Sequence, residues 1–229
     1  MSKKIIIAID GPAASGKSSV AKYLATRLGF TYLDTGAMYR AITYLALKHD
    51  VVNDHDAIVK LVKNIDLQLK FENGITHVFL NGEDVTPFIR TPEVNEKVSE
   101  VSKIPEVRNE LVNIQRRLGD NVNLVAEGRD TTTVVFPNAD LKIYLTADLH
   151  ERANRRFDEY KEKGTRISFD EVKSNLKKRD KIDSQRSVSP LSKAEDAFVL
   201  DTTDLTIEEE IQKIIQKVEQ IKLNKKIEV

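Results

Sequence analysis

One short run near the start of the chain constrains its fold more than any other feature. The run Gly11-Pro-Ala-Ala-Ser-Gly-Lys-Ser18 has the residue spacing of a phosphate-binding loop. An apolar segment at residues 5–9 precedes it, typical of a buried parallel strand, and apolar residues at helical spacing follow between residues 20 and 28. Strand, glycine-rich turn and helix start come in the order that the motif requires, so an ordinary strand-to-helix turn is the weaker alternative.

The chemistry of such a loop predicts a nucleoside triphosphate site. Its backbone N–H groups and the start of the following helix favour an anion. Lys17 adds a full positive charge for the β and γ phosphates, and the Ser18 hydroxyl is the expected Mg²⁺ ligand. The residues expected to hold the triphosphate are Gly11, Pro12, Ala13, Ala14, Ser15, Gly16, Lys17, Ser18 and Ser19.

The composition of the chain narrows the class of protein. Its 229 residues include 36 basic and 36 acidic side chains, and this balance argues against bulk binding to nucleic acid or membranes. The absence of cysteine excludes disulfides and thiolate metal sites. No apolar run is long enough for a signal peptide core or a membrane span. We expect a cytoplasmic α/β domain with room for a small insertion.

Strand and helix patterns alternate along most of the chain, as in an open parallel sheet flanked by helices. The expected strands lie at residues 5–9, 30–33, 122–126, 141–145 and 197–200. Ligands bind such sheets at the carboxyl ends of the strands. Thr35 and Arg40 follow the second strand, and Arg129 and Asp130 follow the third. Alone, Thr35 could be a helix N-cap, and Arg40 a solvated side chain.

Residues 65–86 break this pattern. Apolar residues alternate with polar ones from Ile65 to Phe71, and two Asn-Gly turn signals follow, which predicts a small antiparallel meander. We interpret it as an inserted subdomain. A helix with a polar stripe through Ser99 is expected after Thr91-Pro92, and the next helix carries Arg108 at the edge of its apolar face. The simplest interpretation of Arg108 is an arginine at the surface.

A charged stripe marks the helix expected after Ser168. Its apolar face begins at Val172 and Leu176 and continues at the same spacing through Arg179, Asp183 and Arg186. If this face stays turned inward, the charges need partners or a ligand. If the helix extends beyond the core, the stripe is simply solvated, and the pattern alone does not decide.

Five arginines from separate segments point to a second anionic substrate: Arg40, Arg108, Arg129, Arg179 and Arg186. Guanidinium groups suit bidentate contacts to phosphate, and a triphosphate held at Lys17 does not need so many. This combination is expected for phosphoryl transfer between two phosphate-bearing molecules. An arginine-rich helical hairpin around Gly164 would form a lid that excludes water.

Four motifs in order, spanning nearly the whole chain, resemble those of the bacterial cytidylate kinases, within the nucleoside monophosphate kinase family. They are residues 9–19, Leu33-Asp-Thr-Gly-Ala-Met-Tyr-Arg40, Glu127-Gly-Arg-Asp130 with Val134-Val-Phe-Pro137, and Arg179-Asp180 with Arg186 before Pro190-Leu191. The resemblance implies transfer of the γ-phosphoryl group of ATP to CMP or dCMP by a monomer, with Mg²⁺ arriving on the ATP.

The resemblance also implies an architecture and a set of site residues. A P-loop core with a five-stranded parallel sheet would comprise residues 1–63 and 103–229, with a lid at about 150–168 and a CMP-binding insert at 64–102. Lys17, Arg129 and Arg155 would act on the transferred phosphoryl group. Ser99, Arg179 and Asp183 would bind the cytosine ring and sugar, and Asp130 the sugar. The other acceptor-site residues, several of them expected on the CMP phosphate, would be Thr35, Arg40, Arg108, Arg129 and Arg186.

One segment departs from the family pattern, and rival functions have weaker support. Members of the family often have glycine two residues after the aspartate of Gly-Arg-Asp, where this chain has Asp130-Thr-Thr-Thr133; threonine suits a positive φ angle poorly.

A kinase for UMP or shikimate is the nearer alternative. A GTPase switch would need an Asn-Lys-x-Asp motif, and the Asn-Lys pair at Asn224 lacks the aspartate. From Lys222 onward we expect a frayed tail.

Overall fold

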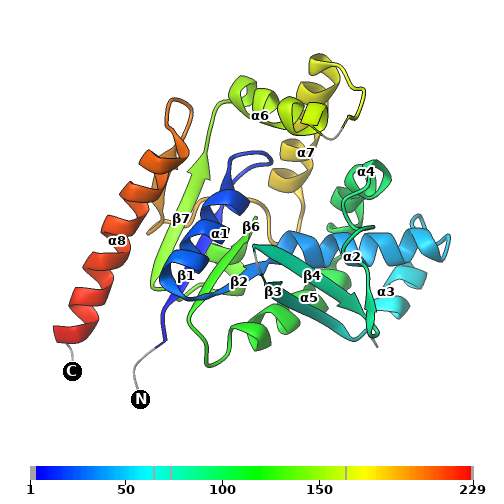
Figure 1. Ribbon diagram of the computed structural model, residues 1–229. Coiled ribbons are helices and arrows are strands. Elements are labelled where there is room, and N and C mark those ends of the chain that lie inside the picture. Colours follow the sequence, from blue (N-terminus) through cyan, green and yellow to red (C-terminus); the bar gives the residue numbers. More distant parts are fainter. Residues whose placement is uncertain (1–3, 64, 73, 163, 228–229) are drawn as a thin grey trace.

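A five-stranded parallel sheet forms the centre of the computed structural model, which describes residues 4–63, 65–72, 74–162 and 164–227 (Figure 1). In spatial order its strands are β2 (Thr31–Asp34), β6 (Leu124–Gly128), β1 (Ile6–Asp10), β7 (Leu141–Thr146) and β8 (Phe198–Asp201). All four neighbouring pairs are parallel, so the carboxyl ends of the strands share one edge. The predicted fold class and its five strands are confirmed, with strand bounds shifted by one or two residues.

Helices cover both faces of this sheet. The elements are α1 (Lys17–Leu28), α2 (Thr35–Lys48), α3 (His55–Lys63), α4 (Pro92–Val101), α5 (Pro105–Gly119), η1 (Thr131–Val135), α6 (Leu149–Glu162), α7 (Phe169–Gln185) and α8 (Ile207–Ile227). One apolar cluster joins the sheet to α1 and α8, as between Ile9, Leu24 and Ile214. The other joins it to α2 and α5, as between Ala126, Ile42 and Leu111.

A separate three-stranded antiparallel sheet confirms the predicted meander. Its strands are β3 (Leu67–Glu72), β4 (Ile75–Leu80) and β5 (Glu83–Asp84). The first turn signal includes Asn73, and the expected insert starts at Asn64; both lie outside the described residues. Asn81 and Gly82 form the second turn with positive φ angles. Buried Val78 and Leu80 join the apolar cluster of α2, so the meander packs beside that helix.

The helix starts follow their sequence signals closely. The Thr91 hydroxyl accepts from the Val94 N–H at 3.4 Å, and Ser168 and Glu171 form a reciprocal capping box. Two helical segments differ from the prediction. Helix α3 was not predicted, although Asp54 accepts from the Ala57 N–H at 3.0 Å and caps it. The prediction of a frayed tail from Lys222 onward is wrong for residues 222–227, which belong to α8.

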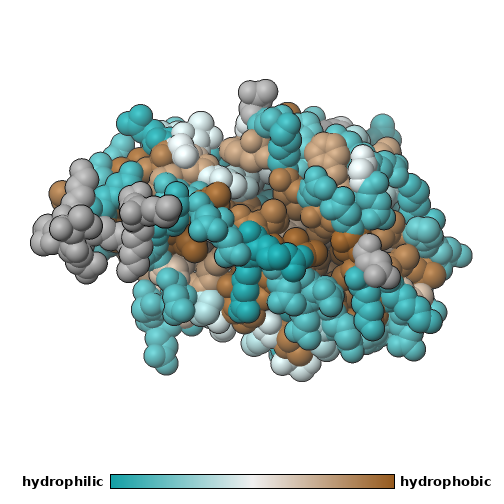
Figure 2. Space-filling model, turned by 90° about the horizontal axis from the view of Figure 1, so that it is seen from below, coloured by the Kyte–Doolittle hydropathy of each residue, from teal (hydrophilic) through white to brown (hydrophobic). Residues whose placement is uncertain are grey.

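The fold places its chemistry at one end. Figure 1 shows α6 and α7 as a hairpin beyond the carboxyl ends of the strands, with α2 to α5 and the meander on one side and α8 on the other. The opposite face mixes hydrophilic side chains with apolar residues that show mainly toward its centre (Figure 2). In the described part of the chain, no helix is both long and apolar enough to span a membrane.

Candidate active site

The phosphate-binding loop between β1 and α1 is held closely against the sheet. A Cβ atom at Gly11 would lie 1.9 Å from the Leu145 carbonyl oxygen, so only glycine fits there. Gly16 has a φ angle of 91° and precedes α1 with no side-chain cap. Gly16 therefore leaves the first N–H groups of α1 without a side-chain cap, as an anion site at a helix start requires.

Lys17 lies in the floor of this loop with only 4% of its surface exposed. Its Nζ atom donates to the Pro12 carbonyl oxygen at 2.7 Å and to Ser15 Oγ at 3.2 Å. Burial lowers the pKa of Lys17 to about 7, and the nearby Arg129 adds to that effect. A positive charge held here is therefore costly until an anion arrives to compensate for its lost hydration.

The carboxylate of Glu127, at the end of β6, faces the start of α1. Ser18 donates its hydroxyl hydrogen bond to Glu127 Oε1, and the Tyr32 hydroxyl donates to the same oxygen at 2.9 Å. Burial raises the pKa of Glu127, and the neighbouring Asp34 carboxylate raises it further. Sequence reasoning placed Glu127 within a motif but gave it no role, because its partner Ser18 is 109 residues away.

The three threonines after Asp130 form a tight turn that replaces the glycine pattern. None of Thr131, Thr132 and Thr133 has a positive φ angle; they start the π-helical turn η1. Both oxygens of the fully buried Asp10 accept from this turn, with Thr132 donating from its N–H at 2.7 Å and its hydroxyl at 2.6 Å. Burial raises the pKa of Asp10, and the threonine hydrogen bonds oppose that rise. The threonines therefore need no positive φ angle here, and the hydroxyls of Thr131 and Thr132 supply hydrogen bonds to Asp10 that glycine could not.

All nine residues predicted for the acceptor site line one pocket of about 60 Å³. They are Thr35, Arg40, Ser99, Arg108, Arg129, Asp130, Arg179, Asp183 and Arg186. They come from α2, α4, α5, α7, the residue that follows α7 (Arg186) and the loop after β6.

Arg108 is buried rather than at the surface, which corrects the simplest interpretation of its sequence position. Its side chain is 1% exposed, forms an ion pair with Asp130, and donates to the Ser102 carbonyl oxygen at 3.0 Å. Its guanidinium carbon lies 5.1 Å from the centre of the Tyr39 ring. Partners from three separate segments pay for this burial, so the pattern of α5 alone did not reveal it.

Thr35 is not the helix N-cap, and Arg40 is not the solvated side chain, that each could be from its sequence position alone. Asp34 caps α2 by accepting from the Ala37 N–H at 2.8 Å, so Thr35 is not the N-cap. The buried Thr35 hydroxyl instead donates to the Glu127 carbonyl oxygen at 2.7 Å. Arg40 is half-buried and donates to Asn95 of α4, so it is not fully solvated.

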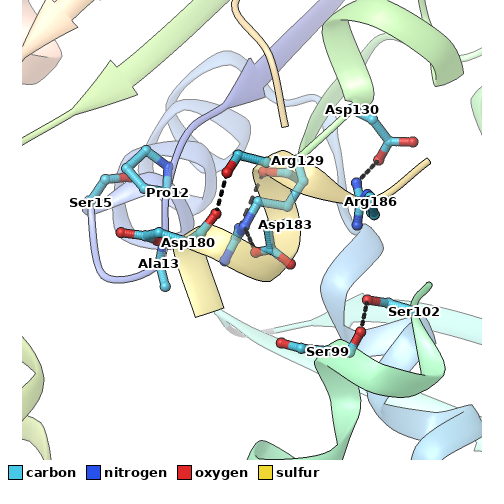
Figure 3. Close-up of polar contacts among 12 residues, drawn as sticks. Pro12, Ala13, Ser15, Ser99, Ser102, Arg129, Asp130, Asp180, Asp183 and Arg186 are labelled. Carbon is cyan, nitrogen blue, oxygen red and sulfur yellow. Dashed lines mark hydrogen bonds and ion pairs between the residues drawn. The ribbon is translucent and has the colours of Figure 1, made fainter. Parts of the chain in front are cut away.

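The charged stripe on α7 faces the pocket. Asp183 is 4% and Arg186 8% exposed. Figure 3 shows Arg129 reaching Asp183 and Arg186 turned toward Asp130. Asp183 Oδ2 accepts from Arg129 Nε at 2.8 Å, and Arg186 Nη2 lies 3.8 Å from Asp130 Oδ1. The solvated alternative for this stripe is therefore wrong.

The pocket holds more positive charge than its own carboxylates neutralise. Burial lowers the pKa of Arg40 to about 9, with repulsion from Arg179 as the next cause. Burial likewise lowers the pKa of Arg179 to about 10, with repulsion from Arg129 next. Among the described residues, the buried Arg179 Nε and Arg186 Nη2 atoms have no hydrogen-bond partner. Converging cations with free donors indicate a site for an anion.

Two further hollows join this pocket to the phosphate-binding loop. A donor pocket of about 390 Å³ follows the loop from Ala14 to Ser19 and reaches α6 and the start of α8. A middle pocket of about 180 Å³ is lined by Lys17 and Ser18 together with Arg40 and Arg129. The two anion sites therefore open into a shared space, with Lys17 and Arg129 on its walls.

The hairpin of α6 and α7 is bonded directly to the phosphate-binding loop. Arg152 donates to the Ala13 carbonyl oxygen at 3.1 Å and to Asp180 Oδ2 at 2.6 Å, and Asp180 Oδ1 accepts from the Ala13 N–H at 3.4 Å. Arg155, predicted to be catalytic, lines the donor pocket and donates to Thr202 Oγ1 at 3.0 Å. Its neighbour Arg156 lines both the donor and the middle pocket.

Several site residues had no predicted role. They are Asp10, Asp34, Arg90, Glu127, Arg152, Arg156 and Asp180. Arg90, just before α4, donates to Asp34 Oδ2 at 2.7 Å, and both residues line the middle pocket. A usable signal existed for Asp10, Asp34 and Glu127, because each stands at the carboxyl end of a strand.

Comparisons with known proteins agree on one family. The family model described as cytidylate kinase matches residues 7–220. The curated protein named cytidylate kinase from Caldanaerobacter subterraneus subsp. tengcongensis is 51% identical over 213 residues, which cover 93% of each chain. Those of Fusobacterium nucleatum and Bacillus subtilis are 50% and 48% identical, with 95% and 96% of this chain covered and 99% of each relative. A solved structure of an uncharacterized protein from Eubacterium ventriosum shares the fold alone, with a TM-score of 0.55 and 16% identity over 95% of this chain and 99% of its own.

Proposed function

This chain belongs to the cytidylate kinase family, and we propose that it transfers the γ-phosphoryl group of ATP to CMP or dCMP, giving ADP and CDP or dCDP. ATP occupies the donor pocket and the monophosphate occupies the arginine-lined pocket across the middle space. The observation that carries this proposal is that one shared space is lined both by Lys17 of the phosphate-binding loop and by Arg129 of the acceptor pocket.

The phosphate-binding loop holds the donor. Backbone N–H groups from Ala14 to Ser18 surround the β phosphate, and Lys17 reaches toward the γ phosphate. Burial removes the hydration of the Lys17 ammonium, and a phosphate bound there would compensate for that loss with its negative charge. Lys17 Nζ donates to Pro12 and Ser15, and its third N–H is left for a phosphate oxygen.

The residues around Ser18 fit a magnesium ion carried by ATP. Mg²⁺ prefers oxygen ligands and keeps several waters, and the Ser18 hydroxyl and the Glu127 carboxylate offer such oxygens side by side. The raised pKa of Glu127, caused first by its burial, fits a carboxylate that needs a nearby cation. When bound, the ion supplies neutralisation of the charge on the transferred phosphoryl group.

The acceptor pocket divides its work along the substrate. We assign Arg40, Arg108, Arg129 and Arg186 to the acceptor phosphate and to the surplus negative charge around it. Asp183, Arg179 and Ser99 bind the cytosine ring and sugar, Asp130 contacts the sugar, and Thr35 lies on the same wall. The acceptor phosphate is already an anion near neutral pH, so positioning and charge neutralisation supply most of the catalysis.

Two segments enclose the substrates. We assign residues 65–102 to acceptor binding, supported by the contacts of Arg40 with Asn95 and of Asp34 with Arg90. The hairpin that spans residues 150–168 acts as a lid over the donor, and Arg155 and Arg156 project from it into the donor pocket. Closing it would exclude water, which competes with the acceptor for the phosphoryl group.

A comparison of possible acceptors tests this function directly. ADP release is measured in a coupled assay with ATP, Mg²⁺ and, in turn, CMP, dCMP, UMP, AMP and shikimate. CMP or dCMP should give the highest kcat/KM. A preference for UMP or shikimate would show a kinase with another acceptor and contradict the assignment to CMP or dCMP. If no acceptor changed the rate of ADP release, the chain would not be a kinase for any of these acceptors.

A further inference from the structure

Glu210 is a buried carboxyl group in the wall of the donor pocket, and neither the family motifs nor the reaction outlined above uses it. It lies near the N-terminus of α8 and is 4% exposed. Its Oε2 atom is buried and has no hydrogen-bond partner among the described residues. Buried polar atoms without a partner are rare, and one that lines a ligand pocket calls for a ligand partner.

The position of Glu210 relates it to the donor rather than to the acceptor. Its Oε2 atom lies 3.7 Å from where a Cβ atom of Gly16 would stand, so it flanks the phosphate-binding loop. Glu210 lines the donor pocket together with Arg155 and Ile207, and none of these three lines the acceptor pocket. Ile207 and Glu210 are three residues apart and so lie on one face of α8.

The chemistry of the pocket selects the part of the donor that Glu210 can contact. Phosphate oxygens only accept hydrogen bonds and carry negative charge, so a carboxylate repels them. The same pocket is lined by Leu205 and Ile207, and Ile207 is 41% exposed, so apolar surface is available for the flat face of a base. The groups of the donor that can donate to Glu210 are its ribose hydroxyls and the amino group of its base.

We propose that Glu210 is a donor-specificity residue that accepts a hydrogen bond from the nucleoside part of ATP, from a ribose hydroxyl or from the base amino group. The proposal rests on ATP being the donor in the function above. It is consistent with the raised pKa of Glu210, about 7, which burial causes and which Arg155 opposes only in part. A buried carboxylate without a hydrogen-bond partner is poorly stabilised, and a donor group of the ligand would offset that cost.

The experiment is a binding cycle on the full-length protein without any acceptor. Calorimetric titrations with Mg²⁺ and ATP, 2′-deoxy-ATP, 3′-deoxy-ATP or inosine triphosphate are made on the natural protein and on Glu210→Ala and Glu210→Gln. Glu208→Ala is the matched control, since Glu208 is exposed on the same helix. Thermal unfolding of each variant is recorded alongside.

Glu210→Ala should weaken ATP binding about tenfold, the worth of one hydrogen bond to a charged group. Glu210→Gln, which keeps an acceptor oxygen, should retain most of the affinity, and Glu208→Ala all of it. The analogue that lacks the contacted group should bind the natural protein and Glu210→Ala equally, which identifies the hydroxyl or the amino group.

Two results would overturn the proposal. One is unchanged ATP affinity in Glu210→Ala, with or without a lower unfolding temperature, which would give Glu210 a structural role. The other is an equal loss for ATP and every analogue. Because binding is measured without acceptor, a natural protein that binds ATP but fails to phosphorylate CMP would refute the proposed function alone.

Discussion

Arg129 Nε donates to Asp183 Oδ2 at 2.8 Å, and this pair joins the end of β6 to α7 where the acceptor and middle pockets meet. Burial alone would raise the pKa of Asp183, but Arg129, Arg179 and Arg186 together hold it below its usual range. Asp183 therefore stays ionised and fixes the direction of the Arg129 guanidinium toward the shared space.

Replacing Asp183 separates the acceptor site from the donor site. In the proposed function Asp183 contacts the nucleoside of CMP and orients Arg129, so Asp183→Ala should raise the KM for CMP by about 10²-fold or more. The KM for ATP should change by less than about threefold, because the phosphate-binding loop is untouched. Steady-state kinetics with each substrate varied in turn measure both.

Asp170→Ala is the control for that experiment, since Asp170 is exposed in the first turn of the same helix. It should leave both KM values near those of the natural protein. If Asp183→Ala raised both KM values equally, the charged stripe on α7 would be structural rather than part of the CMP site.

Replacing Lys17 tests the donor half of the site. Lys17→Ala removes a buried positive charge from the place where charge develops during transfer. The kcat should fall by about 10²- to 10³-fold, or about 3–4 kcal/mol of transition-state stabilisation. Rapid-quench turnover with saturating ATP and CMP checks this, and near-normal turnover would contradict the role given to the loop.

The same lysine should make the stability of the ligand-free protein depend on pH. Burial lowers the pKa of Lys17 from its usual 10.5 to about 7. Between these values the unfolded chain binds a proton that the folded chain lacks, so this group makes the free energy of unfolding rise with pH. Below about pH 7 both states are protonated and the full cost of burying the ammonium remains.

Lys17→Met should therefore be more stable than the natural protein at about pH 7, with the difference closing toward about pH 10. Urea unfolding at both pH values measures this. Lys60→Met is the control, because Lys60 is exposed on α3 and should give parallel profiles. Parallel profiles for Lys17→Met as well would show that the buried lysine keeps an ordinary pKa.

Features carried by local pattern were predictable from the sequence. The phosphate-binding loop, the parallel strands, the meander and the capped helix starts all depend on residues close together in the chain. Helix α3 carried the same kind of signal, with Asp54 as its cap and Ile58 and Val62 as its buried face, and could have been found.

Features that depend on distant partners were not predictable in this way. Arg108 is buried because Asp130 and Tyr39 receive it, and nothing in the pattern of α5 indicates those contacts. The place of Glu127 in the site likewise depends on a distant partner, because its carboxylate accepts from Ser18, 109 residues away. The direction of the α7 stripe needed the whole fold, since an amphipathic pattern does not say whether a helix extends past its core.

The threonine turn after Asp130 can be tested with a matched pair of substitutions. Thr132→Val removes a hydroxyl that donates to the buried Asp10 at 2.6 Å. The hydroxyl of the adjacent Thr133 is buried without a partner among the described residues, so Thr133→Val removes nothing that Asp10 uses. Thr132→Val should cost about 1.5–3 kcal/mol of unfolding free energy, and Thr133→Val close to none. Equal costs in urea unfolding would mean that the turn does not support Asp10 through its hydroxyls.

The close approach of the phosphate-binding loop to β7 gives a last prediction. A Cβ atom at Gly11 would meet the Leu145 carbonyl oxygen at 1.9 Å, and backbone cannot yield as a flexible side chain would. Gly11→Ala should therefore cost about 3 kcal/mol or more of unfolding free energy and displace the loop, so that ATP binding is lost as well. Gly29, with a φ angle of 67°, has no neighbour within 4 Å of such an atom. Gly29→Ala should thus cost only the backbone strain, about 1–2 kcal/mol, and bind ATP normally. If both variants bound ATP equally well in calorimetry, the loop would not depend on its contact with β7, because only Gly11→Ala disturbs it.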